Sequence, residues 1–142
     1  MDSELKREII LEHFQNPLNK EIVENENYEL VNTRNPNCID NLDIYVLLED
    51  DVIKDIKFMG EACAISTAST SIMIKNLIGK NISDAKEYIN NFYHMCDEEE
   101  YSEELLNEGL AFSDIYKQNN RKNCALLPYK GILKALEEYE EK

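Results

Sequence analysis

Three cysteines and one aspartate are the residues with the most distinctive chemistry in this chain. Cys38 lies two places before Asp40 in the turn-like stretch NPNCID, and Cys63 and Cys124 follow far along the chain. Three thiolates and a carboxylate form a tetrahedral ligand set for zinc, and the thiolates also suit iron–sulfur chemistry. The wide spacing does not match a C-x-x-C ribbon or a zinc finger, so these residues form one site only if the fold brings them together.

Hydrophobic periodicity predicts the elements that must position these residues. Strands are predicted at 28–35, 41–49 and 52–59, the last two joined by a turn at Asp50 and Asp51. Helices are predicted at 3–14, 62–79, 81–95 and 103–117, and from about residue 124 onward. This order predicts an α+β fold in which a small three-stranded antiparallel sheet has helices packed on one face.

The predicted elements give each cysteine a position in the fold. Cys38 lies in the loop between the first two strands, and Cys63 lies where the third strand meets a helix. Cys124 lies at the predicted start of the last helix, because Pro128 is best tolerated in a first turn. A helix N-terminus favours a thiolate over a thiol, and loops at the ends of a small sheet can converge. Either the three thiols meet Asp40 at one edge, or each cysteine is a small buried hydrophobe.

Length and charge restrict the class of protein. The 142 residues suit a single domain, 1–142. The 29 acidic and 15 basic residues give a net charge of −14, which disfavours binding to nucleic acid or to an anionic membrane. No apolar run is long enough to span a membrane, and MDSELKREII lacks the apolar core of a signal peptide. We therefore expect a cytoplasmic protein without structural disulfides, whose acidic runs at 97–104 and 137–142 are solvated.

Four motifs, in order, carry a resemblance to a known family: HFQNPLN (13–19), NPNCID (35–40), GEACAISTASTSIM (60–73) and RKNCALLPYKGI (121–132). Over nearly its whole length the chain resembles the IscU/SufU/NifU-N-terminal family of iron–sulfur cluster assembly proteins. The resemblance implies a SufE/NifU-like fold and a metal site made by Cys38, Asp40, Cys63 and Cys124.

Several features are similar to the SufU branch of that family rather than to the IscU branch. Asn123 stands where IscU-type proteins carry a histidine, and 118–123 lack their proline-rich chaperone motif. An insertion around 95–116 and the arginine at position 121 also match SufU-type proteins. One departure is Ile39, which replaces the family's glycine; if that glycine takes a positive φ, isoleucine is strained there.

The resemblance implies a zinc-dependent acceptor of persulfide sulfur, a candidate sulfurtransferase that acts with a SufS-type cysteine desulfurase. Cys124 is the acceptor expected from its helix-start position, supported by Arg121, and the desulfurase carries the pyridoxal phosphate. Downstream partners are an iron–sulfur scaffold or apo-protein acceptors. One alternative is a scaffold that builds a [2Fe–2S] cluster on the same residues; another, from a different class, is a structural zinc module that binds a partner.

Other reactive side chains are expected to lie outside the site. Cys96 matches no part of the family pattern, and its acidic neighbours should raise its pKa. His94 is expected at the surface, and His13 is expected to have a structural or partner-facing role. The serines Ser66, Ser69 and Ser71 are expected to be small packing residues, since no histidine is positioned to activate them.

Overall fold

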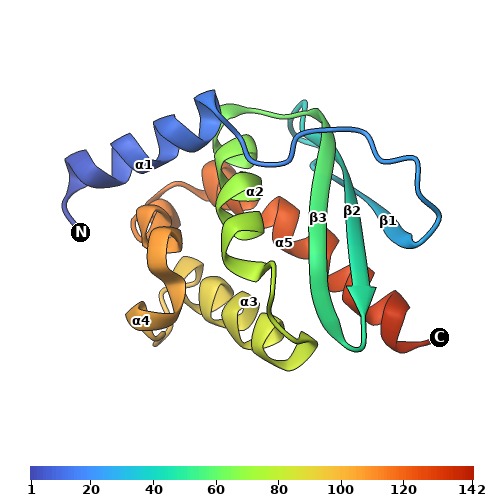
Figure 1. The fold of residues 1–142 in the computed structure, drawn as a ribbon. Helices are drawn as coiled ribbons and strands as arrows, with labels where there is room; N and C mark the ends of the chain where they lie inside the picture. Colours follow the sequence, from blue (N-terminus) through green and yellow to red (C-terminus); the bar gives the residue numbers. More distant parts are fainter.

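The computed structural model describes all 142 residues, which form one sheet and a set of helices (Figure 1). The strands are β1 (Tyr28–Arg34), β2 (Asn41–Glu49) and β3 (Val52–Glu61), paired antiparallel in the order β1-β2-β3. The α-helices are α1 (Ser3–Gln15), α2 (Ala64–Leu77), α3 (Ile82–Cys96), α4 (Glu103–Leu106) and α5 (Asn119–Glu140), with the 3-10 helices η1 (Asn107–Phe112) and η2 (Ile115–Lys117) between α4 and α5. The predicted α+β class and the antiparallel sheet are confirmed. No helix combines the length and the apolar character that crossing a membrane requires.

The sheet is built as the sequence predicts. Alternate residues of β2 are buried, and Asp50 and Asp51 join β2 to β3 with φ of 53° and 63°. Two consecutive positive φ values are typical of the tight turn that matches the twist of a β-hairpin. The segment before β1 crosses the outer edge of β3, where Lys20 forms a β-bridge with Phe58 and the Phe58 N–H donates to the Asn19 carbonyl at 3.1 Å.

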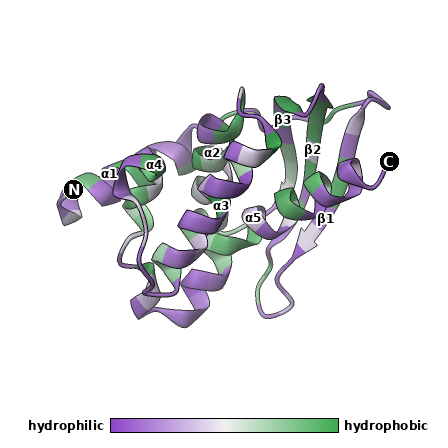
Figure 2. Ribbon diagram, turned by 90° about the horizontal axis from the view of Figure 1, so that it is seen from below, coloured by the Kyte–Doolittle hydropathy of each residue, from purple (hydrophilic) through white to green (hydrophobic).

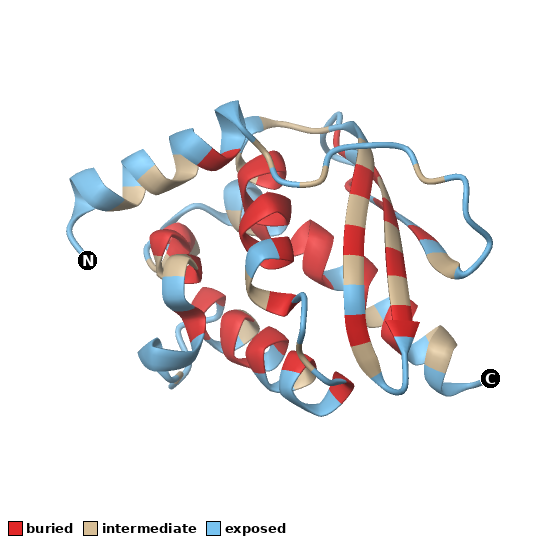
Figure 3. Ribbon diagram, viewed as in Figure 1, coloured by how far each residue is buried: buried red, intermediate tan, exposed pale blue.

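The helices form a layer on one face of the sheet, as predicted. Helix α5 packs against β1 and β2, and α2 packs beside it (Figure 1). Gly131 lets α5 approach β2 closely, since a Cβ there would lie 2.8 Å from Ile44 Cδ1. The buried residues of α2, α3 and α5 form one hydrophobic core with the inner face of the sheet, in which α3 packs on α5, while polar residues line the outer faces of the helices (Figures 2 and 3). This packing fixes the ends of α2 and α5 relative to the strands.

The structure corrects two predicted helices. Residues 103–117 form α4, η1 and η2 instead of one helix, because Asn107 adopts a positive φ of 49°. Gly109 also brings this segment close to α3, where a Cβ would lie 2.7 Å from the Tyr88 hydroxyl. The last helix begins at Asn119 rather than near residue 124, so Pro128 lies inside α5. Cys124 is therefore not at a helix start.

Candidate metal centre

Asn35 organises the loop that carries Cys38. Its backbone N–H donates to the Asp40 carbonyl at 3.1 Å, and its carbonyl accepts from the Cys38 N–H at 3.1 Å. Its side-chain oxygen accepts from the Asn37 N–H at 3.1 Å, as in an Asx-turn. The loop is thus closed on itself at the end of β1, with the Cys38 side chain exposed.

Asp40 is fully buried at the end of this loop, directly before β2. Its Oδ1 accepts from the Cys63 N–H at 2.6 Å, and its Oδ2 accepts from the Ser66 hydroxyl at 2.6 Å. Burial pulls the pKa of Asp40 upward, but the hydrogen bonds from Ser66, the Cys63 N–H and two thiols outweigh it and hold the pKa below its usual value. The carboxylate is therefore kept ionised and held in one orientation.

Cys63 is the N-cap of α2, as predicted for a residue at this junction. Its sulfur accepts from the Ser66 N–H at 3.4 Å and lies 3.6 Å from Asp40 Oδ2. The sulfur thus caps one of the backbone N–H groups that the helix N-terminus leaves without an intrahelical partner.

Cys124 is the sixth residue of α5 and is 7% exposed. The backbone N–H that would normally bond its carbonyl belongs to the residue four places later, which is Pro128 and has none. The Ser66 hydroxyl lies 3.0 Å from this carbonyl instead. One turn further along α2, Ser69 donates to the Ala125 carbonyl at 2.6 Å. Two serines of α2 thus bind the stretch of α5 that Pro128 disrupts.

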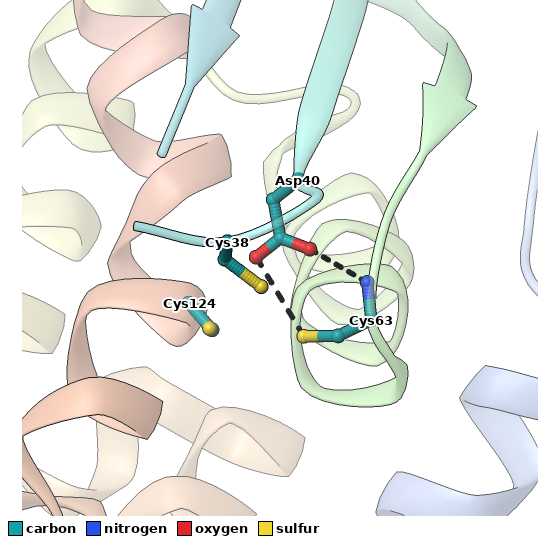
Figure 4. Close-up of side chains that lie close together, drawn as sticks. All are labelled: Cys38, Asp40, Cys63 and Cys124. Carbon is teal, nitrogen blue, oxygen red and sulfur yellow. Dashed lines mark hydrogen bonds between the residues drawn. The ribbon is translucent and has the colours of Figure 1, made fainter. Parts of the chain in front are cut away.

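These three elements bring Cys38, Asp40, Cys63 and Cys124 together (Figure 4). One donor atom from each residue lies within 4.8 Å of the others. Two sulfurs that share a tetrahedral zinc are about 3.7 Å apart at the usual Zn–S bond length. Small side-chain rotations are enough to close the difference, so the three sulfurs and one carboxylate oxygen fit a zinc ion.

The three sulfurs differ in how they meet solvent. Cys38 is exposed and opens on a hollow of about 490 Å³ that Arg34, Ile39 and Glu61 help to line. Cys124 is buried, and burial, followed by the hydrogen bond to Asp40, raises the pKa of its thiol. Cys63 is intermediate between the two, so Cys38 is the sulfur that an incoming group reaches most easily.

Ile39 and Arg121 flank the site, and both are exposed. Ile39 is 67% exposed and does not adopt a positive φ, so isoleucine is not strained in place of glycine. Arg121 is exposed on α5, one turn before Cys124, where it lines a hollow with Arg7 and Ile65.

The other reactive residues lie outside the ligand set, as expected. Cys96 is fully buried, and burial, more than the neighbouring Asp97, raises its pKa to about 12. His94 is exposed, whereas His13 is buried between the Ser71 hydroxyl at 2.7 Å and a Glu108 carboxylate oxygen at 3.3 Å. Through these bonds His13 connects α1 to α2 and η1, which is a structural role. The expectation that no histidine lies beside the three serines is therefore wrong for Ser71.

Sequence reasoning missed the roles of Ser66 and Asn35. Both are buried, and each contacts more than one ligand residue of the site. The available signal for Ser66 was its spacing, because a residue three places after an N-cap lies beside that cap. Its bond to the Cys124 carbonyl depends on a proline in another helix, which no local pattern reveals.

Comparisons with known proteins agree on the class of this chain. A family model for the NifU-like N terminal domain matches residues 5–142. The zinc-dependent sulfurtransferase SufU of Bacillus subtilis (strain 168) is 33% identical over 137 residues, which is 96% of this chain and 92% of the relative. The iron-sulfur cluster assembly scaffold protein IscU of Thermotoga maritima is 34% identical over 72% of each chain. The crystal structure of FiSufU from Fervidobacterium islandicum AW-1 matches with a TM-score of 0.86 at 33% identity, covering 91% of this chain and 94% of that one.

Proposed function

Because the chain belongs to the family of NifU-like N-terminal domains, we propose that it is a cytoplasmic, single-domain iron–sulfur cluster assembly protein that accepts persulfide sulfur from a cysteine desulfurase. The observation that carries this proposal is the convergence of three sulfurs and one carboxylate within 4.8 Å. The similarity to a zinc-dependent sulfurtransferase over almost the whole chain supports the sulfur-acceptor role over a purely structural one.

We propose that Cys38, Asp40, Cys63 and Cys124 hold one zinc ion. Zinc bound there would keep the thiols deprotonated and hold the loop, α2 and α5 together. Asp40 supplies the oxygen that faces the sulfurs, since its other oxygen is bound to the Cys63 N–H at 2.6 Å. Arg121, one turn before Cys124 on α5, would add positive charge beside a ligand set that carries four negative charges.

Transfer requires a thiolate that meets the persulfide of the partner. In that step the thiolate attacks the outer sulfur, the sulfur–sulfur bond of the partner breaks, and the partner's cysteine leaves as a thiolate. Cys124 is the acceptor that the sequence predicts, but its predicted helix-start position is wrong and its side chain is buried. We propose that the exposed Cys38 receives the sulfur first, with Cys124 as the competing assignment.

A second function for the same residues is a scaffold that assembles and transfers a [2Fe–2S] cluster. Its support is the sulfur-rich ligand set and the 34% identity to a scaffold protein of the IscU type. In either function the proposed partners are a SufS-type desulfurase and downstream scaffold or apo-protein acceptors.

Metal analysis together with sulfur mapping tests the proposal. The purified protein should be colourless with one zinc, whereas a red-brown protein with iron would favour the scaffold. After incubation with a SufS-type desulfurase and cysteine, peptide mass spectrometry should find the persulfide on Cys38. Cys38→Ser should abolish stimulation of desulfurase turnover, and Cys96→Ser, the buried control, should leave it intact. Labelling of Cys124 in the Cys38→Ser variant would instead support Cys124 as acceptor, and zinc without any sulfur uptake would indicate a structural module.

A further inference from the structure

Ser66 has two hydrogen-bond acceptors and one proton to give. It is fully buried in the first turn of α2, with its Oγ 2.6 Å from Asp40 Oδ2 and 3.0 Å from the Cys124 carbonyl oxygen. A serine hydroxyl carries a single proton, so it donates at full strength to only one of them. The two acceptors belong to two residues of the ligand set that lie on different elements.

Each acceptor lacks one of its ordinary donors. The Cys124 carbonyl lacks its usual helical donor because Pro128 has no N–H. Asp40 Oδ2 is the carboxylate oxygen that faces the sulfurs and is not bound to the Cys63 N–H. Besides Ser66 it accepts from the Cys63 thiol at 3.6 Å, and that donor is lost when the thiol ionises to bind a metal. A buried acceptor without a donor is costly, so whichever group loses the proton must have another partner. For Asp40 Oδ2 that other partner is a metal ion.

We propose that Ser66 is a positioning residue that makes Asp40 an exchangeable ligand. The hydroxyl donates to Oδ2 while the carboxylate is free of metal, and it turns to the Cys124 carbonyl when Oδ2 binds the metal. A carboxylate that leaves the metal thus finds a donor already in position, which lowers the cost of its release. This inference rests on the proposed function, since it requires Asp40 to be a ligand.

Replacing Ser66 should strengthen metal binding, although no ligand changes. Hydrogen bonds to a carboxylate are roughly twice as strong as those to a neutral carbonyl. Ser66→Ala therefore destabilises the metal-free protein more than the metal-bound one. We expect the Kd for Zn²⁺, measured against a chromophoric chelator at fixed pH, to fall about fivefold, with slower zinc release. A residue that only supported the ligands would give weaker binding when removed.

Ser69 provides a matched control on the same helix. Its hydroxyl donates to the Ala125 carbonyl at 2.6 Å, and it is as deeply buried as Ser66. This bond ends on the backbone of α5 rather than on a ligand side chain. Ser69→Ala should therefore lower the melting temperature of both forms equally and leave the Kd for Zn²⁺ unchanged.

Pro128 allows the same mechanism to be tested with the opposite sign. Pro128→Ala supplies the missing N–H to the Cys124 carbonyl, so the Ser66 proton gains no partner when it leaves Asp40. We expect zinc binding to weaken by up to about fivefold, because the Cys124 carbonyl then no longer needs the Ser66 proton in the metal-bound protein. In the Ser66→Ala background the Pro128→Ala change should have no effect on affinity. Without the Ser66 proton, the added N–H stabilises the metal-free and metal-bound proteins equally, so the two substitutions are coupled only through Ser66.

Three results would overturn this inference. They are a Ser66→Ala protein that binds zinc no more tightly than wild type, a Ser69→Ala protein that matches Ser66→Ala, and a Pro128→Ala effect that is equal in both backgrounds. If wild type binds zinc and accepts sulfur while any of these holds, the role of Ser66 fails and the proposed function stands. If wild type binds no zinc, both are wrong.

Discussion

At the scale of single residues, Cys38 is the most exposed and Cys96 the least exposed of the four free cysteines. Cys38 is exposed, whereas Cys96 is fully buried with a pKa raised to about 12. A raised pKa keeps the group protonated as the thiol, which does not react with alkylating agents, until the pH approaches that value.

This difference predicts the order of alkylation in the metal-free protein. With iodoacetamide at about pH 8, Cys38 should be modified first and Cys96 last, with the rate at Cys96 rising only in strongly alkaline solution. Peptide mass spectrometry over a time course measures the order. Early modification of Cys96 under native conditions would contradict its burial; modification of Cys96 in urea is the positive control.

The ligand residues were the most predictable part of the site, because their motifs are local. Asp40 follows Cys38 by two places, and Cys63 begins a helix after a strand; both patterns are legible in the sequence. The environment of Cys124 could not be predicted in this way, because it depends on Pro128, which is tolerated inside a helix. That tolerance comes from Ser66 and Ser69 on another helix, so only the tertiary structure reveals it.

At the scale of elements, Gly60 fixes how β3 leads to Cys63. It has a φ of +133°, and a Cβ there would lie 2.1 Å from the Asn41 carbonyl oxygen, next to Asp40. Gly79, which follows α2, has a φ of +94°, but a Cβ added there would meet no atom within 4 Å. The two glycines thus share a conformation that disfavours side chains, but only Gly60 is also confined by its neighbours.

Gly60→Ala should therefore damage the site and Gly79→Ala should not. We expect Gly60→Ala to cost roughly 2–4 kcal/mol of unfolding free energy and to reduce zinc retention. Gly79→Ala should cost about 1–2 kcal/mol, from backbone strain alone, with zinc retention unchanged. Urea unfolding and metal analysis measure the two effects. Equal losses of zinc would show that the approach of Gly60 to Asn41 does not position the site.

Strands were predicted better than the segment between α3 and α5. The hairpin of β2 and β3 is specified by alternation and by two adjacent aspartates that tolerate positive φ. Residues 103–117 have an apolar spacing close to helical, but Asn107 interrupts the helix, and Tyr88 and Phe92 on α3 determine the path of the chain. Such packing constraints are non-local and override the propensity of a short segment.

At the scale of the whole molecule, the site joins the loop before β2, the start of α2 and the second turn of α5. A metal that binds only the folded protein stabilises it by about 4 kcal/mol when its free concentration is a thousand times the Kd. Removal of the metal should therefore lower the melting temperature on the order of 10 °C for a chain of this size.

Calorimetry with and without a chelator measures this shift. The Cys63→Ser variant is the control, because a protein that has lost a ligand should melt at the lower temperature and respond little to the chelator. An unchanged melting curve for the wild type after complete removal of the metal would show that the site contributes nothing to the stability of the fold.

The β-bridge between Lys20 and Phe58 has a consequence for solubility. An open sheet has two edges that can pair with strands of other molecules, and the Asn19–Lys20 segment covers part of the edge formed by β3. The opposite edge, β1, carries the charged side chains of Glu29 and Arg34, which disfavour intermolecular pairing. Shortening the chain from its N-terminus past Lys20 would uncover β3 and expose a ready template for aggregation.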